Sequence, residues 1–215
     1  MSQAISDIVE IVSQQLGEFH IYADGVSKFF AEDSEKLLGS PSVVHSVKYR
    51  IKDIEHLREK ISRKQAEGRL ISTANVFQEI TDIAGIRVLH LHLEQLKIIH
   101  AAILKRDWVL AETPKAYSWD PETVTFMQSL GLDTHLKPSQ YTSVHYVVKP
   151  NAASPLSCEI QVRTLFEEIW GEVDHILNYP TPTTNLASAE QLKVLAKVVG
   201  AGSRLVDSLF RTHTT

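Results

Sequence analysis

Residues 158–164 read CEIQVRT, in which polar and apolar side chains alternate. A β-strand shows alternate residues on one face, so Glu159, Gln161 and Arg163 share a surface while the apolar residues between them point the other way. An acid and a base on one strand face, followed directly by a predicted helix over 165–177 with further charged residues, indicate a binding or catalytic site.

A second carboxylate, Asp82, precedes the β-branched stretch 84–92, where Gly85 lets another group approach the backbone closely. By itself an aspartate at this place is more often a cap or turn residue. Two carboxylates from neighbouring strands, however, are what hold a magnesium ion, which prefers oxygen ligands and keeps waters while it bridges phosphates. If Asp82 and Glu159 converge, the sequence predicts a magnesium site.

Basic residues are concentrated between positions 48 and 64, at Lys48, Arg50, Lys52, Arg58, Lys60, Arg63 and Lys64. Such a run can be no more than a solvated helix surface. Arg50 and Lys52 lie on one strand face immediately before the helix, however, so strand and helix together could hold a triphosphate. Arginine would bind it through planar bidentate contacts and lysine as a point charge.

Aromatic and histidine side chains follow in the segment 137–146. Tyr141 lies between polar residues after Lys137, where it is a poor core candidate and could stack on a nucleotide base or simply cover its own loop. His145 is either a phosphate contact or a satisfied buried histidine.

The helix over 165–177 has two predicted stripes. A polar stripe consists of Glu168, Glu172 and His175, and the stripe expected to be buried consists of Leu165, Ile169, Val173 and Ile176. With one cysteine in the chain and no second histidine nearby, the polar stripe is a poor zinc site.

Hydrophobic periodicity and capping residues predict the elements that position these groups. Strands are expected over 43–51, 84–92, 108–113, 143–149 and 156–163, and helices over 4–38, 53–67, 93–105, 120–131, 165–177 and 187–211. The short helix at 120–131 interrupts a long connection, 113–136, that looks like an insertion. The order of elements predicts an α+β fold, a mixed sheet of about five strands flanked by helices. We expect an N-terminal helical element (1–41), a central domain (42–180) and a C-terminal linker and helix (181–215).

Composition narrows the class of protein. The chain has 215 residues, 43% of them hydrophobic, which suffices for a substantial core. Its single cysteine excludes an intramolecular disulfide, and no apolar run approaches the roughly 18 residues of a membrane span, so a cytoplasmic protein without membrane contact is expected. A net charge of −4 gives no overall basic footprint for nucleic acid. The amphipathic terminal segments could pack on the sheet, mediate self-association or dock a partner.

Five segments in order, RIKDIEHLREKISRK, DIAGIRV, KPSQYTSVHY, EIQVRT and WGEVDHILNY, resemble the RelA/SpoT synthetase domain of the alarmone synthetases, including their small single-domain members. The resemblance covers about residues 45–179. It implies a nucleotidyltransferase-like sheet and an ATP-dependent pyrophosphokinase that transfers the β,γ-pyrophosphate of ATP to the 3′-hydroxyl of GDP or GTP, with Mg²⁺ as cofactor. No histidine–aspartate hydrolase domain is found, so no degrading activity is expected.

The resemblance also implies roles for particular residues. ATP would be bound by Arg50, Lys52, Lys60 and Arg87, the metal by Asp82 and Glu159, and the acceptor nucleotide by Lys137, Tyr141, His145, Gln161 and Arg163. Glu159 would be either the second metal ligand or the base for the attacking hydroxyl.

The departures from the family pattern concern the acceptor side. Ser139 and Gln140 stand where Asn-Gly is usual, Asp53 and His56 where serines are usual, and Pro180 in place of a lysine. Alternative acceptors are therefore the 3′ end of tRNA and an adenine nucleotide, although the acidic overall charge disfavours tRNA. Two other classes remain: a catalytically silent nucleotide-binding module, which would not require the Asp82–Glu159 pair, and a nucleotidyltransferase of another kind on the same sheet.

Overall fold

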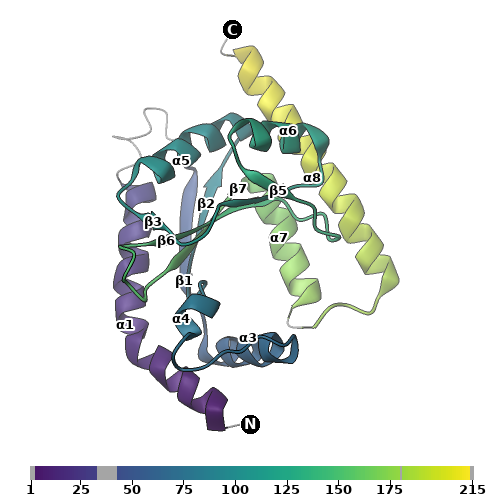
Figure 1. Ribbon diagram of the computed structural model, residues 1–215. Coiled ribbons are helices and arrows are strands. Elements are labelled where there is room, and N and C mark those ends of the chain that lie inside the picture. Colours follow the sequence, from purple (N-terminus) through teal and green to yellow (C-terminus); the bar gives the residue numbers. More distant parts are fainter. Residues whose placement is uncertain (1–2, 33–42, 180, 214–215) are drawn as a thin grey trace.

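The computed structural model describes residues 3–32, 43–179 and 181–213. Its elements follow in the order α1 (Gln3–Ala31), β1 (Ser46–Ile51), α3 (Ile54–Ala66), α4 (Val76–Glu79), β2 (Ala84–His90), α5 (Leu93–Lys105), β3 (Val109–Leu110), β4 (Lys115–Tyr117), α6 (Pro121–Ser129), β5 (Asp133–His135), β6 (Ser143–Lys149), β7 (Cys158–Thr164), α7 (Leu165–Asn178) and α8 (Leu186–His213). The expected α+β class is confirmed, and Figure 1 shows one sheet enclosed by helices.

One mixed sheet of seven strands forms the centre of the molecule. The strand order is β1-β2-β7-β6-β4-β5, and β3 pairs with β6. Strands β2 and β7 are parallel, whereas β1 with β2 and β6 with β7 are antiparallel. The helical connection α5 lies in the long crossover between the two central parallel strands, as parallel pairing requires.

The two faces of the central strands differ in polarity. Ile86 and Val88 of β2 and Ile160 and Val162 of β7 are buried in the main hydrophobic core, which also includes residues of α1 and α5. The alternate positions, among them Arg87, Glu159 and Gln161, are polar and partly exposed. The alternation read from EIQVRT is thus confirmed at these positions.

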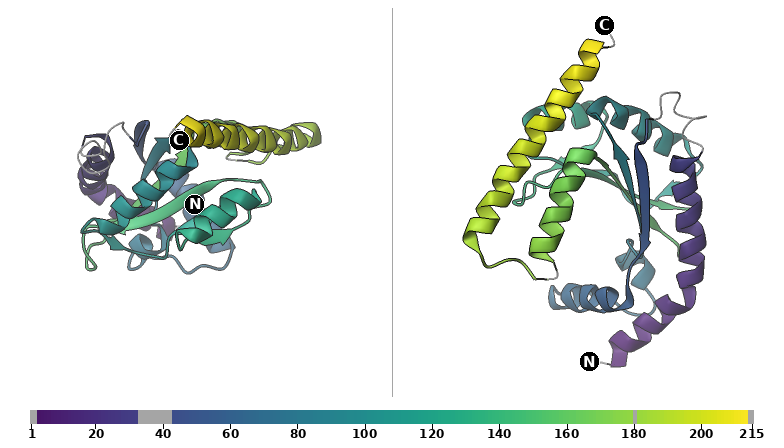
Figure 2. Two further views of the ribbon diagram at one scale, coloured as in Figure 1. Left: turned by 90° about the horizontal axis from the view of Figure 1, so that it is seen from above. Right: turned by 180° about the vertical axis from the view of Figure 1, so that it is seen from behind.

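The helices lie around this sheet in two groups. Helix α1 packs along β1 and β2, while α7 packs against β7 and β2 and also against the long helix α8. Figure 2 shows α8 as a rod at the periphery, on the far side of the molecule from α1. Helix α3 begins at an Asp53 cap, whose side chain accepts hydrogen bonds from the backbone of Glu55 and His56.

The expected element list lacks three short elements, α4, β4 and β5. The connection 113–136 contains two short strands, β4 and β5, in addition to the predicted helix α6, so the sheet is larger than five strands. Three-residue strands carry too little alternation to be read from sequence, and β5 exists because it pairs with β4. The helix expected over 4–38 is described to Ala31, and the remainder of that prediction falls outside the described residues.

The predicted buried stripe of the helix at 165–177 is wrong at Ile169 and Ile176, whereas Val173 packs against the cluster around Trp170. Ile169 is 55% and Ile176 77% exposed, whereas Glu168 is 5% exposed and Trp170 2%. Trp170 packs with Leu192 of α8, whose carbonyl accepts a hydrogen bond from the indole nitrogen at 3.0 Å. Glu168 is buried because it meets cations of the sheet, so ion pairing toward the sheet and apolar packing toward α8 together set the orientation of this helix.

Candidate active site

A cleft of about 310 Å³ opens on the polar face of the sheet, between the central strands and helix α7. It is lined by Lys48, Tyr49, Arg50, Asp82, Gly85, Ile86, Arg87, Glu159, Gln161, Glu172 and His175. A volume of this size is typical of small-ligand sites. Asp82 and Glu159, remote in the sequence, therefore share one cavity.

Strand register explains how the cleft acquires its polar floor. Lys48 pairs with Arg87, Arg87 with Gln161, and Gln161 with His145, so one row across four strands carries these side chains. Directly paired residues of adjacent strands project from the same face. In a neighbouring row, Arg50 pairs with Gly85 and Gly85 pairs with Glu159.

Asp82 is held by two lysines at the start of β2. Its Oδ2 lies 2.6 Å from Lys60 Nζ and 3.1 Å from Lys52 Nζ. Burial by itself would raise the pKa of Asp82, but the two ammonium groups outweigh it and hold the pKa below its ordinary value. Asp82 is therefore an anion at neutral pH. The predicted ATP residues Lys52 and Lys60 do not line the cleft themselves but contact Asp82, which does.

Glu159 belongs to a closed ring of hydrogen bonds. Its two oxygens accept from His145 Nδ1 at 3.1 Å and Gln161 Nε2 at 2.7 Å. Arg163 donates to Gln161 Oε1 and, at 2.8 Å, to the hydroxyl of Tyr141, which lies 2.8 Å from His145 Nε2. An ionised carboxylate only accepts, so the proton of this His145–Glu159 contact belongs to Nδ1.

The same ring determines the charge of Glu159. Burial alone would raise its pKa, but the contacts with His145 and Gln161 and the charge of Lys60 lower the pKa to about 2. Glu159 stays ionised throughout the physiological range. The negative charge of Glu159 partly opposes the lowering of the Asp82 pKa by the two lysines, so each carboxylate influences the other.

These two carboxylates are suited to a hard divalent cation. Asp82 Oδ1 is buried and has no hydrogen-bond partner, in contrast to its fellow oxygen. A buried carboxylate oxygen without a partner is costly, and a metal ion in the cleft would satisfy it. Among the described residues no group of three or more His, Cys, Asp or Glu side chains could hold a metal. A cation here would take its other ligands from water and phosphates, as Mg²⁺ does.

The predicted acceptor residues form a cluster beside the cleft. The ammonium of Lys137 lies 4.6 Å from the ring centre of Tyr141 and 4.2 Å from that of Tyr117. Burial lowers the pKa of Lys137, although Glu159 opposes this. The cluster is joined to the cleft by the His145–Glu159 and Arg163–Gln161 contacts, so the two predicted regions lie side by side.

Two expectations for this cluster need correction. Tyr141 is not an exposed loop aromatic, because its ring packs near those of Tyr117, His145 and Trp170 at centroid distances of 5.9, 5.7 and 6.1 Å. Arg163 was expected to share an accessible strand face with Glu159 and Gln161. It is 4% exposed and bound to Glu168 of α7 at 3.2 Å.

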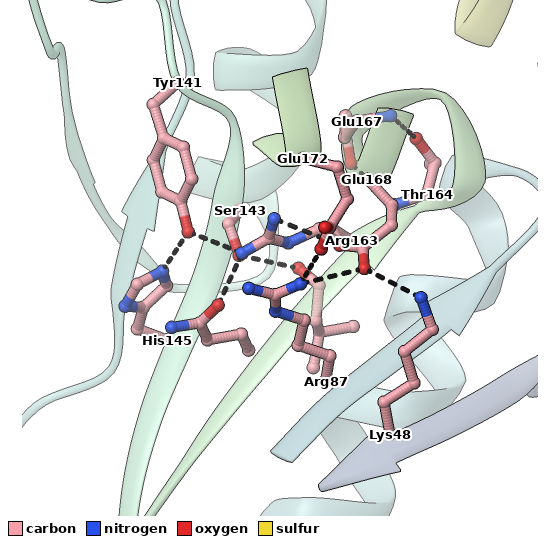
Figure 3. Close-up of polar contacts among 12 residues, drawn as sticks. Lys48, Arg87, Tyr141, Ser143, His145, Arg163, Thr164, Glu167, Glu168 and Glu172 are labelled. Atoms are coloured by element: carbon pink, nitrogen blue, oxygen red, sulfur yellow. Dashed lines mark hydrogen bonds and ion pairs between the residues drawn. The ribbon is translucent and has the colours of Figure 1, made fainter. Parts of the chain in front are cut away.

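Helix α7 supplies carboxylates that sequence reasoning did not include among the site residues. Glu168 Oε1 contacts Arg87 at 3.1 Å and Lys48 at 3.4 Å, while its Oε2 contacts Arg163 (Figure 3). Glu172, one turn further along, also binds the Arg87 guanidinium. The polar stripe of this helix signalled these residues, but its partners could not be read from sequence. Tyr117 was missed because its strand was read as part of an insertion.

Comparisons with known proteins show the family of the chain. A family model described as a region found in RelA/SpoT proteins matches residues 49–184. The GTP pyrophosphokinase YwaC of Bacillus subtilis (strain 168) is 22% identical over 185 residues, covering 81% of this chain and 80% of that protein.

Solved structures show the same fold. The small alarmone synthetase 1 of B. subtilis, bound to its product pppGpp, superimposes with a TM-score of 0.72 at 19% identity, covering 94% of this chain and 98% of that one. A GTP pyrophosphokinase family protein from Streptococcus pneumoniae gives 0.65 at 23% identity, with 97% and 94% covered. Since the family model spans more than half of its length, the chain belongs to the RelA/SpoT family.

Proposed function

We propose that this protein is an ATP-dependent pyrophosphokinase that transfers the β,γ-pyrophosphate of ATP to the 3′-hydroxyl of GDP or GTP, producing (p)ppGpp. The observation that supports this most directly is the convergence of Asp82 and Glu159 on one cleft bordered by cations. The relatives named above are a GTP pyrophosphokinase and a synthetase bound to pppGpp.

The donor half of the site suits a triphosphate. Arg50, Arg87 and Lys48 line the cleft, and Lys52 and Lys60 stand behind Asp82. Phosphoryl and pyrophosphoryl transfer require little covalent participation by the protein, because positioning and neutralisation of charge provide most of the catalysis. These cations would hold the phosphate chain in line with the attacking oxygen and stabilise the charge that develops on the departing AMP.

Mg²⁺ is the metal we propose for the free oxygen of Asp82, with Glu159 as the second carboxylate. When bound, it would neutralise the charge of the ATP phosphates. A carboxylate with a pKa of about 2 is a weak base. This favours Glu159 as a metal ligand or a hydrogen-bond acceptor for the 3′-hydroxyl over its role as a general base.

The acceptor half is proposed to be the cluster of Lys137, Tyr141 and His145, continued by Gln161 and Arg163. Lys137 provides positive charge for acceptor phosphates, Arg163 positions Tyr141 and Gln161 by hydrogen bonds, and Tyr117 and Tyr141 provide aromatic rings for the base. In the present arrangement the Lys137 ammonium lies over both rings, so a base that stacks on Tyr141 would displace it toward the phosphates.

A direct test uses purified protein, Mg²⁺ and ATP labelled with ³²P at the γ-phosphate, with GDP, GTP, ADP or tRNA in separate reactions. Label on GDP or GTP together with release of unlabelled AMP is the expected result. If only ADP or tRNA became labelled, that molecule would be the acceptor in place of GDP or GTP. Release of pyrophosphate with AMP joined to the acceptor would indicate a nucleotidyltransferase. No product with any acceptor would refute an enzymatic role and leave the silent nucleotide-binding module.

The carboxylate pair is tested by Asp82→Ala and Glu159→Ala. Loss of a charge contact in a transition state costs about 3 to 4 kcal/mol, on the order of a hundredfold or more in rate. Asp24→Ala and Glu190→Ala are matched controls, because each of these carboxylates forms an exposed ion pair with a lysine of its own helix. Turnover by either cleft variant at the rate of its control would refute the assignment.

Within the described part of the chain, no helix combines the length and hydrophobicity that a bilayer span requires. We propose that the reaction takes place in the cytoplasm, where ATP and guanine nucleotides are available. The free thiol of Cys158 is buried in the core, in keeping with a reducing compartment.

A further inference from the structure

Arg87 is the only cation of the cleft, among the residues described, that two carboxylates of α7 bind together. Glu168 and Glu172 lie four positions apart on the helix, so their side chains project from the same face. Both reach the same guanidinium nitrogen of Arg87. Figure 3 shows the two carboxylates converging on this guanidinium.

The two carboxylates differ in how firmly they are held. The side chain of Glu168 is 7% exposed and is also bound to Lys48 and to buried Arg163. The side chain of Glu172 is 49% exposed, and Arg87 is its only ion-pair partner in the described structure. Glu168 is therefore a fixed anchor of Arg87, whereas Glu172 can turn into solvent at little cost.

The position of Glu172 is one that a phosphate would occupy. Glu172 and Arg87 both line the cleft, together with Arg50, Asp82 and Glu159. Arginine binds carboxylates and phosphates with the same planar set of donors. An ATP phosphate that reaches Arg87 thus meets a guanidinium already bound by a carboxylate, within a cleft that contains further negative charge.

On the basis of the proposed function, we propose that Glu172 is an intramolecular competitor for the ATP phosphates at Arg87 and sets the affinity for the donor nucleotide. In the free protein Glu172 keeps the guanidinium paired and turned toward α7. When ATP binds, a phosphate replaces Glu172, and Glu168 continues to position Arg87 from behind. Glu172 contributes to affinity and not to the chemical step.

The test measures binding of the α,β-methylene analogue of ATP, AMPCPP, with Mg²⁺ by calorimetry. Transfer of the β,γ-pyrophosphate breaks the bond between the β-phosphorus and the oxygen that bridges it to the α-phosphorus, and AMP leaves with that oxygen, so a methylene in place of the bridging oxygen prevents turnover. Glu172→Gln keeps the size of the side chain and removes its charge. Glu190→Gln is the matched control, because it makes the same change of net charge in an exposed ion pair on α8.

We expect Glu172→Gln to lower the Kd for AMPCPP about two- to fivefold relative to Glu190→Gln, the range that an exposed ion pair supports. The difference should shrink at 0.5 M NaCl, where such pairs are screened. Glu172→Ala provides a second variant, and thermal unfolding verifies that both are folded.

An unchanged Kd would overturn the inference. A higher Kd would overturn it too, because Glu172 would then orient Arg87 for the nucleotide. Failure of the wild-type protein to bind AMPCPP would instead count against the proposed function, so the two ideas fail in different measurements.

Discussion

Glu168 offers the most direct test of what holds the polar face of the sheet in place. Its carboxylate faces Lys48, Arg87 and Arg163, but these pairs are unequal. The side chain of Lys48 is 60% exposed and contributes little, and Arg87 keeps Glu172 as a second partner. Arg163, whose side chain is 4% exposed, has no other carboxylate among the described residues.

We therefore expect Glu168→Gln to destabilise the protein by about 3 kcal/mol. Removal of one partner from a buried ion pair typically costs about 3 to 5 kcal/mol, and the amide oxygen of glutamine retains part of the hydrogen bonding. For a chain of this length the change corresponds to a drop in Tm of roughly 6 to 12 °C.

The assay is urea unfolding at pH 7, followed by circular dichroism, with a double-mutant cycle of Glu168→Gln and Arg163→Met. A coupling energy of about 2 to 3 kcal/mol is expected between these two positions, whereas Lys48→Ala should change the stability by less than about 0.5 kcal/mol. A loss below about 1 kcal/mol for Glu168→Gln would refute the reasoning, because the pair would then behave as a surface ion pair.

Three further outcomes are expected. A Cβ added at Gly171 would lie 2.5 Å from Arg163 Nη1, so Gly171→Ala should lower the free energy of unfolding in urea by about 1 to 3 kcal/mol. At the control position Gly17 nothing lies within 4 Å of such a Cβ, so Gly17→Ala should be neutral or stabilising. Equal effects of the two substitutions would contradict this prediction. Burial raises the pKa of Glu167 to about 7 from 4.5, so the folded protein holds a proton that the unfolded chain releases between these values. The contribution of Glu167 to stability should fall by up to about 3 kcal/mol as the pH rises from 4.5 to 7, against an opposite contribution from buried His90, whose pKa is lowered to about 4. Glu167→Gln should remove the Glu167 contribution, and an unchanged pH profile in the variant would exclude it. Finally, EDTA should abolish pyrophosphoryl transfer and excess Mg²⁺ restore it, and full activity in EDTA would rule out a metal at Asp82 and Glu159.

Much of the site can be predicted from the sequence because the alternation of polar and apolar residues along its strands is a local feature. The alternation in EIQVRT indicates which of Glu159 and Ile160 faces the site, since the period of two is a property of the strand itself. The basic series and the Asp53 cap likewise predict a cationic strand followed by a helix, and β1 and α3 follow in that order. Local geometry suffices for these features.

The sequence does not predict which residues from different strands contact one another. Asp82 lies beside Glu159 only because β2 and β7 pair in parallel, and the sequence between them gives no register. The strands β4 and β5 exist through pairing, so Tyr117 could not be recognised as a neighbour of Tyr141.

The sequence alone determined the two strand faces, the cationic segment and the family to which the chain belongs. The tertiary structure alone decided the direction of α7, where Ile169 and Ile176 face outward and Glu168 faces inward. Periodicity assumes that the apolar side of a helix is the buried one. Here buried Arg163 and partly buried Arg87 on the sheet pair with carboxylates of α7, and these partners become visible only when the strands are assembled.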